Sequence, residues 1–99
     1  MGMYAPLGEE DYKLSGLIAT AVRDLHPEEV EEGCFVTIRK DEVSSLLAAL
    51  DRKIRAFRII NEDGTVSAQS CYTLSVAAQF AGELVVWLST GETEEIVFC

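Results

Sequence analysis

The first strong pattern along the chain is helical. Between residues 9 and 25, apolar residues recur at spacings of three and four, which places on one helix face Leu14, Leu17, Ile18, Ala21, Val22 and Leu25. Three acidic residues at 9–11 fall in the first turn of this stretch, where the helix dipole favours negative charge. Pro27 has no amide hydrogen to donate and ends the pattern. We therefore predict a helix over residues 9–25, entered by a flexible segment over residues 1–8.

A strand and a second helix are predicted next. An acidic turn over residues 27–33 precedes residues 34–39, in which apolar and polar side chains alternate with the period of a β-strand. Asp41 is a suitable N-cap for a helix whose apolar positions again keep the helical spacing, namely Val43, Leu46, Leu47, Leu50 and Ile54. The order of elements is then helix, strand, helix.

A β-hairpin is predicted after this helix. Residues 57–60 and 65–70 flank the sequence Asn61-Glu62-Asp63-Gly64, in which Gly64 can supply the positive φ of a tight turn. The second of these strands is polar and small, which is typical of an edge strand.

The last third of the chain allows two interpretations. We favour a strand to about residue 74, a short helix to Gly82, and a closing hairpin made of residues 83–89 and 94–98. The alternative is one helix over residues 74–89. Gly82 would cost such a helix about 1 kcal/mol, and apolar residues would surround it on every side.

Together these elements predict a small single α+β domain, with helix–strand–helix followed by mainly antiparallel strands. We expect about four to five strands and two to three helices. The length of 99 residues and the 48% hydrophobic content suit one compact domain with a real core. No apolar run approaches the ~18 residues of a membrane span, so we expect a cytoplasmic protein with no membrane segment.

Cysteine and histidine chemistry is sparse. Cys34, Cys71 and Cys99 show neither a paired disulfide framework nor a metal-ligand spacing, which favours a reducing compartment and predicts no metal site. We expect Cys34 and Cys71 in apolar surroundings and Cys99 exposed at the last position. His26 precedes Pro27 at a predicted helix end, where it suits the role of a C-terminal cation.

Catalytic chemistry is not indicated. The sequence has no P-loop glycine pattern, dinucleotide fingerprint, nucleophile elbow or zinc-protease motif. We therefore expect no enzymatic activity, no catalytic residues and no cofactor. A ligand-binding or enzymatic role for Tyr72, Cys71 or His26 ranks last among the hypotheses.

The charge layout is the most informative feature of the sequence. The formal charge of −9 divides into −6 over residues 1–32, +3 over residues 33–58 and −6 over residues 59–99. A direct nucleic-acid binder is disfavoured, because phosphate contacts need a basic surface. Four basic residues gather near the end of the second predicted helix: Arg52, Lys53, Arg55 and Arg58. We expect them to stabilise the helix dipole and to pair with the protein's own acids. A contact with phosphate is the weaker alternative.

These charges predict a small acidic protein-binding module. The candidate contact residues form two acidic groups, Glu28, Glu29, Glu31 and Glu32 on one and Glu92, Glu94 and Glu95 on the other. A chain of this size and acidity is similar in character to toxin-immunity proteins and to phage-encoded inhibitors of nucleic-acid-handling defence enzymes, some of which mimic DNA. The expected partner is a protein with a basic surface, and mimicry requires the two groups to adjoin in space.

An apolar contact is the alternative function. The predicted strand 83–89 is apolar on both faces, so its outer face around Val85 and Trp87 could form a homodimer or dock an accessory subunit on a larger complex.

Overall fold

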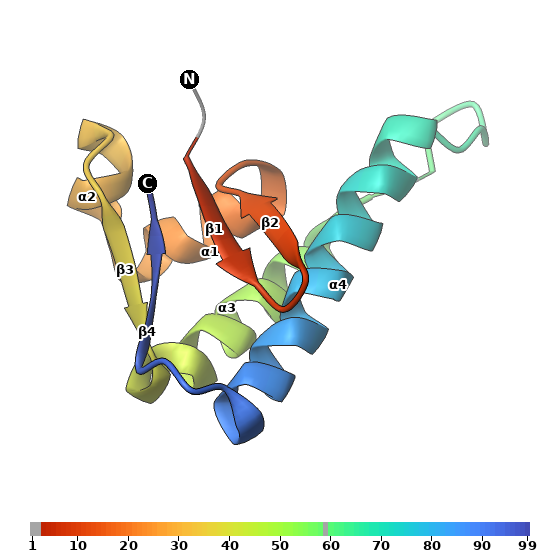
Figure 1. Cartoon of the computed structure of the whole chain (residues 1–99). Coiled ribbons are helices and arrows are strands. Elements are labelled where there is room, and N and C mark those ends of the chain that lie inside the picture. The colour runs from red at the N-terminus through yellow and green to blue at the C-terminus, as the bar shows by residue number, and fades with distance from the viewer. Residues whose placement is uncertain (1–2, 59) are drawn as a thin grey trace.

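The polypeptide begins with a β-hairpin and continues mainly as helices. The computed structural model describes residues 3–58 and 60–99 (Figure 1). Within these residues the strands are β1 (Tyr4–Leu7), β2 (Glu10–Lys13), β3 (Val36–Arg39) and β4 (Glu95–Phe98). The α-helices are α1 (Gly16–Leu25), α2 (Pro27–Glu32), α3 (Val43–Ala56) and α4 (Ala68–Thr90), with a 3₁₀ turn (Lys40–Glu42) before α3. The α+β class expected from the sequence is confirmed.

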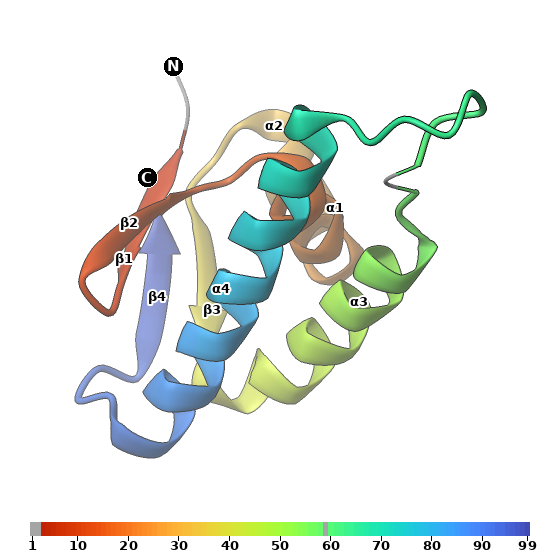
Figure 2. The same ribbon diagram turned by 90° about the vertical axis from the view of Figure 1, so that its right-hand side faces the viewer.

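The four strands form two antiparallel pairs that lie side by side. β1 pairs with β2, and β3 pairs with β4 in the register that sets Val36 opposite Phe98 and Arg39 opposite Glu95. Tyr4 and Cys99 exchange two backbone hydrogen bonds of 3.0 Å, which join β1 to β4. The spatial order is therefore β2–β1–β4–β3, with the helices packed against one side of the strands (Figure 2).

The core lies between the strands and the helices α1, α3 and α4. Alternate strand residues point inward and are buried: Ala5, Leu7, Tyr12, Val36, Ile38, Ile96 and Phe98. Phe80 of α4 occupies the centre of this layer, with its ring 5.2 Å from that of Tyr12 and 6.2 Å from that of Phe98. Full burial of a side chain of this size stabilises the fold by about 1.5–3 kcal/mol, so these positions fix how the helices sit on the strands.

The N-terminal prediction was wrong in part. The helix is confirmed only for Gly16–Leu25, whereas the expected flexible segment and the first half of the expected helix form the β1–β2 hairpin. Gly8 turns the hairpin with a φ of 67°, and Ser15 is extended before the helix starts. The acidic residues at 9–11 therefore lie in the hairpin turn and on β2. Met1 and Gly2 of the expected flexible segment lie outside the described residues.

The acidic stretch expected as a turn is the short helix α2. Pro27 occupies its first turn, where a missing amide hydrogen costs nothing, and Gly33 ends it with a left-handed φ of 70°. The predicted strand and second helix are confirmed as β3 and α3. Asp41 is not the cap of α3. It lies in the preceding 3₁₀ turn, where Glu42 accepts a hydrogen bond of 3.1 Å from the Arg39 backbone N–H.

The last third of the chain contradicts the favoured interpretation and agrees with the alternative. One continuous helix, α4, replaces the predicted strand, short helix and second strand. Gly82 lies on the exposed side, where an added Cβ would meet no atom within 4 Å, and burial of Phe80, Leu84 and Trp87 on the other side offsets its cost of about 1 kcal/mol. Apolar residues lie on several sides of α4: one stripe packs into the core, whereas Val85, Val86 and Leu88 are exposed.

Neither predicted hairpin forms as expected. The first is a single bridge between Ile60 and Val66, although Gly64 does take the expected positive φ, at 84°. The strand predicted over 94–98 is confirmed as β4, but its partner is β3 instead of residues 83–89.

Candidate functional site

α2 carries one of the two acidic groups expected from the sequence, Glu28, Glu29, Glu31 and Glu32. We name these four residues the α2 surface. Glu28 and Glu29 lie in the first turn, where the dipole favours them, whereas Glu31 and Glu32 lie at the negative end of a helix that has no basic residue in its last turn. Like charges three or four positions apart also repel by about 0.2–0.5 kcal/mol per pair. Glu31 and Glu32 therefore destabilise the last turn of the helix that carries them.

Cations neutralise little of the α2 surface. Among residues 3–58 and 60–99, one of these carboxylates lies within ion-pair distance of a basic side chain: Oε2 of Glu29 is 4.0 Å from Nδ1 of His26. The other ring nitrogen of His26 lies 2.6 Å from a carboxylate oxygen of Glu42, which ties the α1–α2 junction to the start of α3. Its position at the C-terminal end of α1 is the one expected from the sequence.

The second acidic group lies beyond α4 and has basic neighbours. Glu92 and Glu94 lie in the exposed segment between α4 and β4, and Glu95 begins β4 opposite Arg39. The Lys40 ammonium donates a hydrogen bond of 2.6 Å to the Gly91 carbonyl and lies 5.5 Å from the centre of the Trp87 ring. Two cations therefore reduce the negative potential at this end of the molecule.

The structure does not bring the two acidic groups together. The α2 surface precedes β3 at the end where Val36 faces Phe98, and Glu95 lies at the other end, where it faces Arg39. These ends are about 10 Å apart along the strand, since β3 rises about 3.3 Å per residue. Figure 1 shows α2 and the start of β4 at opposite ends of β3.

Several bases of the middle segment pair with the protein's own acids. Lys53 lies 3.5 Å from Asp24 of α1, and Arg55 lies 3.0 Å from Asp51 one turn earlier in α3. A hydrogen bond to Asp41 and the nearby carboxylates of Asp41 and Glu42 raise the pKa of the Arg39 guanidinium. These pairs leave less of the basic cluster free for a phosphate.

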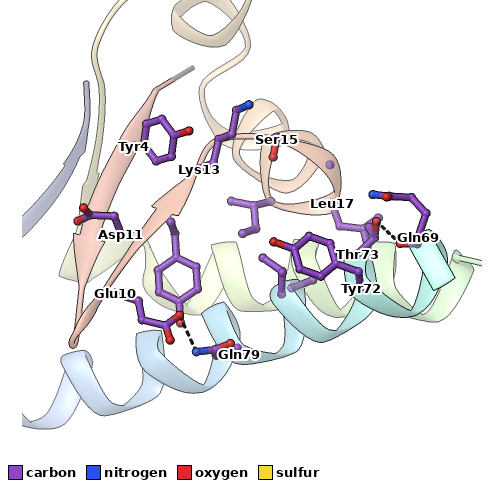
Figure 3. A pocket seen from close by; sticks show the side chains of 15 residues that line it. Tyr4, Glu10, Asp11, Lys13, Ser15, Leu17, Gln69, Tyr72, Thr73 and Gln79 are labelled. Atoms are coloured by element: carbon purple, nitrogen blue, oxygen red, sulfur yellow. Dashed lines mark hydrogen bonds between the residues drawn. The ribbon is translucent and has the colours of Figure 1, made fainter. Parts of the chain in front are cut away.

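An open hollow of about 600 Å³ lies on another side of the molecule (Figure 3). Residues of the β1–β2 hairpin, the start of α1 and the first half of α4 line it. Gln79 donates a hydrogen bond of 2.8 Å to Glu10 across one end. The buried Tyr12 hydroxyl makes no well-formed hydrogen bond among the described residues. Burial, followed by the Glu10 and Glu83 carboxylates, raises the pKa of Tyr12, and the nearby Gln79 side chain opposes this rise only in part.

Sequence reasoning missed this hollow apart from Tyr72, because its walls come from segments distant in the chain. Its lining mixes acids, a lysine, tyrosines and amides, with no arrangement that indicates a particular ligand. The one hint in the sequence was that residues 67–75 are mostly small and polar, which is equally typical of an exposed strand.

Two further expectations need correction. Cys34 and Cys71 are exposed, as is Cys99, because the first lies beyond the end of α2 and the second lies on the outer side of α4. The apolar sheet face around Val85 and Trp87 does not exist, since both belong to α4. Trp87 is only 7% exposed and donates a hydrogen bond of 3.0 Å to Thr93, whereas Val85 is 53% exposed.

Metal-ligand geometry is absent from the described part of the chain, where no group of three or more His, Cys, Asp or Glu side chains is placed to hold an ion. Comparisons with protein-family models, with curated proteins and with solved structures give no match.

Proposed function

We propose that this protein is a small acidic binding module that docks on a basic surface of a partner protein through the α2 surface. One observation carries the proposal: four glutamates gather on six residues of helix, and two of them, Glu31 and Glu32, lie at the end where the helix dipole disfavours negative charge. A helix selected for stability alone would place bases in its last turn, and α2 has none there. The exposed carboxylates are therefore available to a partner.

The chemistry of such a contact is direct. Lysine and arginine side chains form charge-assisted hydrogen bonds with carboxylates, and an exposed patch of one sign accelerates encounter with a surface of the opposite sign. The formal charge of −9 adds to this steering at low ionic strength. Binding by this surface should weaken as salt screens the charges.

An inhibitor of a nucleic-acid-handling protein is the form of this function that we favour. The carboxylates of α2 would occupy the lysine and arginine positions that otherwise hold phosphates. Six helical residues span about 9 Å, which corresponds to two or three phosphates along one strand. The contact would therefore block a local phosphate site rather than imitate a length of duplex. The second acidic group is a separate surface: Glu92, Glu94 and Glu95. A partner bound to the α2 surface could contact it only by extending along β3.

The test removes charge from the α2 surface without altering the fold. Tagged protein captures partners from lysate of its native cell at low and at high salt, and mass spectrometry identifies them. We expect a basic protein that is retained at low salt, released at high salt, and lost from the variant Glu31→Gln/Glu32→Gln.

The matched control is Glu9→Gln/Glu62→Gln, which removes the same charge from two exposed positions elsewhere. This control should retain the partner. Retention of every partner by the α2 variant, or equal loss from both variants, contradicts a specific role for the α2 surface.

A further inference from the structure

β3 is an edge strand that begins beside the α2 surface. The strand order β2–β1–β4–β3 gives β3 a single strand neighbour, β4. Figure 1 shows β3 at the margin of the molecule, with α2 at its start. The outer side of an edge strand carries N–H and C=O groups with which another extended chain can pair.

The register of β3 and β4 identifies the backbone groups on this outer side. The Lys40 N–H donates a hydrogen bond of 3.2 Å to the Glu94 carbonyl of the β4 side. Backbone groups point to alternate sides along a strand, so the even-numbered residues of 36–40 pair with β4. The odd-numbered residues point away from β4, and they are Phe35, Thr37 and Arg39.

Two of these three residues have open backbone groups. The Arg39 N–H already donates to the Glu42 carboxylate at 3.1 Å. Within the described ranges 3–58 and 60–99, no hydrogen bond occupies the outward N–H and C=O groups of Phe35 and Thr37. Phe35 is 72% exposed, so the core does not cover this position. We name the outward backbone groups of Phe35 and Thr37 the β3 edge.

The other edge of the sheet differs in charge. β2 is the second edge strand, and three of its four residues are charged, namely Glu10, Asp11 and Lys13. Charged side chains on an edge strand discourage pairing with a further chain. Phe35 and Thr37 have no charge. The unprotected edge is therefore the one that adjoins the α2 surface.

We infer that the basic partner binds with an extended segment that pairs with the β3 edge as an antiparallel strand. This inference rests on the proposed function and specifies the conformation of the partner. Only Gly33 and Cys34 separate Phe35 from Glu32, so the C-terminal end of such a segment reaches the α2 surface. Its lysine and arginine residues lie at that end. A β-branched residue lies opposite Phe35, because aromatic and β-branched side chains form favourable cross-strand pairs.

A second copy of this chain is the competing occupant and fits less well. Antiparallel pairing of two β3 strands about Thr37 would set Phe35 against Arg39 of the second copy. Glu42 occupies the N–H of Arg39, so one hydrogen bond of each such pair is lost. Two copies that each carry −9 also repel, whereas a basic segment is attracted.

A synthetic segment tests the pairing directly. The probe is the acetylated and amidated peptide Ser-Val-Thr-Val-Lys-Arg-Lys, in which the valines would lie opposite Thr37 and Phe35. Amide NMR spectra of isotope-labelled protein should show shifts at Phe35 and Thr37 and slower hydrogen exchange at Thr37. We expect a Kd of roughly 100 µM at low salt, measured by titration to about 2 mM peptide.

An N-methylated peptide separates strand pairing from simple charge attraction. Methyl groups on both valine nitrogens keep every side chain and charge but remove the two donors that face the β3 edge. This peptide should bind at least about tenfold more weakly and should no longer shift Thr37. Against the unmethylated peptide, Glu31→Gln/Glu32→Gln should lose about tenfold in affinity at low salt while Phe35 and Thr37 still shift.

Variants at Thr37 give the matched test on the protein. Thr37→Pro removes the outward N–H and leaves the hydrogen bonds to β4 intact, a placement that proline accepts in an edge strand. It should bind the unmethylated peptide at least about tenfold more weakly, whereas Thr37→Val, which keeps the N–H, should bind like wild type. If the amide spectrum shows that Thr37→Pro perturbs the fold, the comparison of the two peptides decides the question.

Three results overturn the inference. One is the absence of shifts at Phe35 and Thr37 at about 2 mM peptide. Another is equal binding of the two peptides, which would assign the contact to charge alone. The third is a doubling of mass in sedimentation with shifts at Thr37 in the absence of peptide, which would assign the β3 edge to a second copy.

The lysate capture distinguishes this inference from the proposed function. A partner that Thr37→Pro retains and Glu31→Gln/Glu32→Gln loses contradicts strand pairing and leaves the α2 surface in its proposed role. A partner that the α2 variant retains contradicts the proposed function itself. Loss of the same partner from both variants, with retention by Thr37→Val, is the expected result.

Discussion

Reversing one charge of α2 should stabilise the protein while it weakens partner binding. Glu32 lies at the negative end of α2, four residues after Glu28 and three after Glu29. Glu32→Lys removes two like-charge pairs of about 0.2–0.5 kcal/mol each and replaces them with two attractive pairs of similar size. It also converts an unfavourable interaction with the helix dipole into a favourable one, each worth about 0.3–1 kcal/mol.

The sum is about 1–2 kcal/mol after allowance for solvent screening at these surface positions and for overlap among the contributions. Thermal unfolding followed by circular dichroism at low salt should show this gain, since 1 kcal/mol raises Tm by about 4–8 °C in a domain of this size. In 1 M salt most of the gain should disappear, because the screening length falls to about 3 Å. The same variant should lose the partner captured through the α2 surface.

A matched reversal separates this local effect from general relief of net charge. Glu9→Lys changes the formal charge equally, but Glu9 lies in the β1–β2 turn and not in a helix. We expect Glu9→Lys to raise Tm by much less than Glu32→Lys. Equal shifts in the two variants, or no shift in Glu32→Lys, would refute the claim that the α2 carboxylates are held at a cost in stability.

The remaining predictions concern the core and one helix end. Phe80→Ala empties the centre of the aromatic layer and should cost about 3–5 kcal/mol in urea unfolding; a midpoint close to wild type would contradict the central position of this ring. Gly33→Ala should cost about 1 kcal/mol in the same assay because Gly33 has a φ of 70°, whereas an unchanged midpoint would mean that α2 ends differently. Tyr12→Phe removes a buried hydroxyl without a partner and should leave stability at pH 7 unchanged or raise it by about 1 kcal/mol, while Tyr72→Phe, at an exposed ring, should have no effect. Burial raises the pKa of Tyr12 in the folded protein above its ordinary value of 10.0, so ionisation of Tyr12 lowers the free energy of unfolding as pH rises from 10 through the folded-state pKa, whereas below pH 10 it has no such effect. Tyr12→Phe should therefore reduce the loss of stability above pH 10. Parallel pH profiles for the variant and the wild type would contradict this.

Local patterns determined those elements whose buried face alternates with an exposed one. The helical spacing in α1 and α3 and the period of two in β3 each describe one apolar side, which either element can form before it meets the rest of the chain. The turn residues Pro27, Gly33 and Gly64 also act locally. Pro27 and Gly33 nevertheless bound a helix and not the turn expected from the sequence.

Tertiary contacts decided the hairpin and α4. Ala5, Leu7 and Tyr12 become a buried strand face because α4 packs against them, with Phe80 beside Tyr12, and because β4 joins β1 through Tyr4 and Cys99. Residues 83–89 have apolar side chains on all sides, so no period distinguishes strand from helix. The helix forms because its core stripe completes the aromatic layer around Phe80 and because β3 takes β4 as its partner.

The same division applies to the acidic surface. Counting residues establishes two acidic ends and a basic middle, because formal charge depends on composition alone. Whether the two ends adjoin depends on the antiparallel register of β3 and β4, which joins residues about 60 positions apart and sets Glu95 beside Arg39, far from α2. The sequence therefore determined how much charge the protein carries and where it falls along the chain. Only the tertiary structure decided which carboxylates are left without a cation, because ion pairing depends on distances in space.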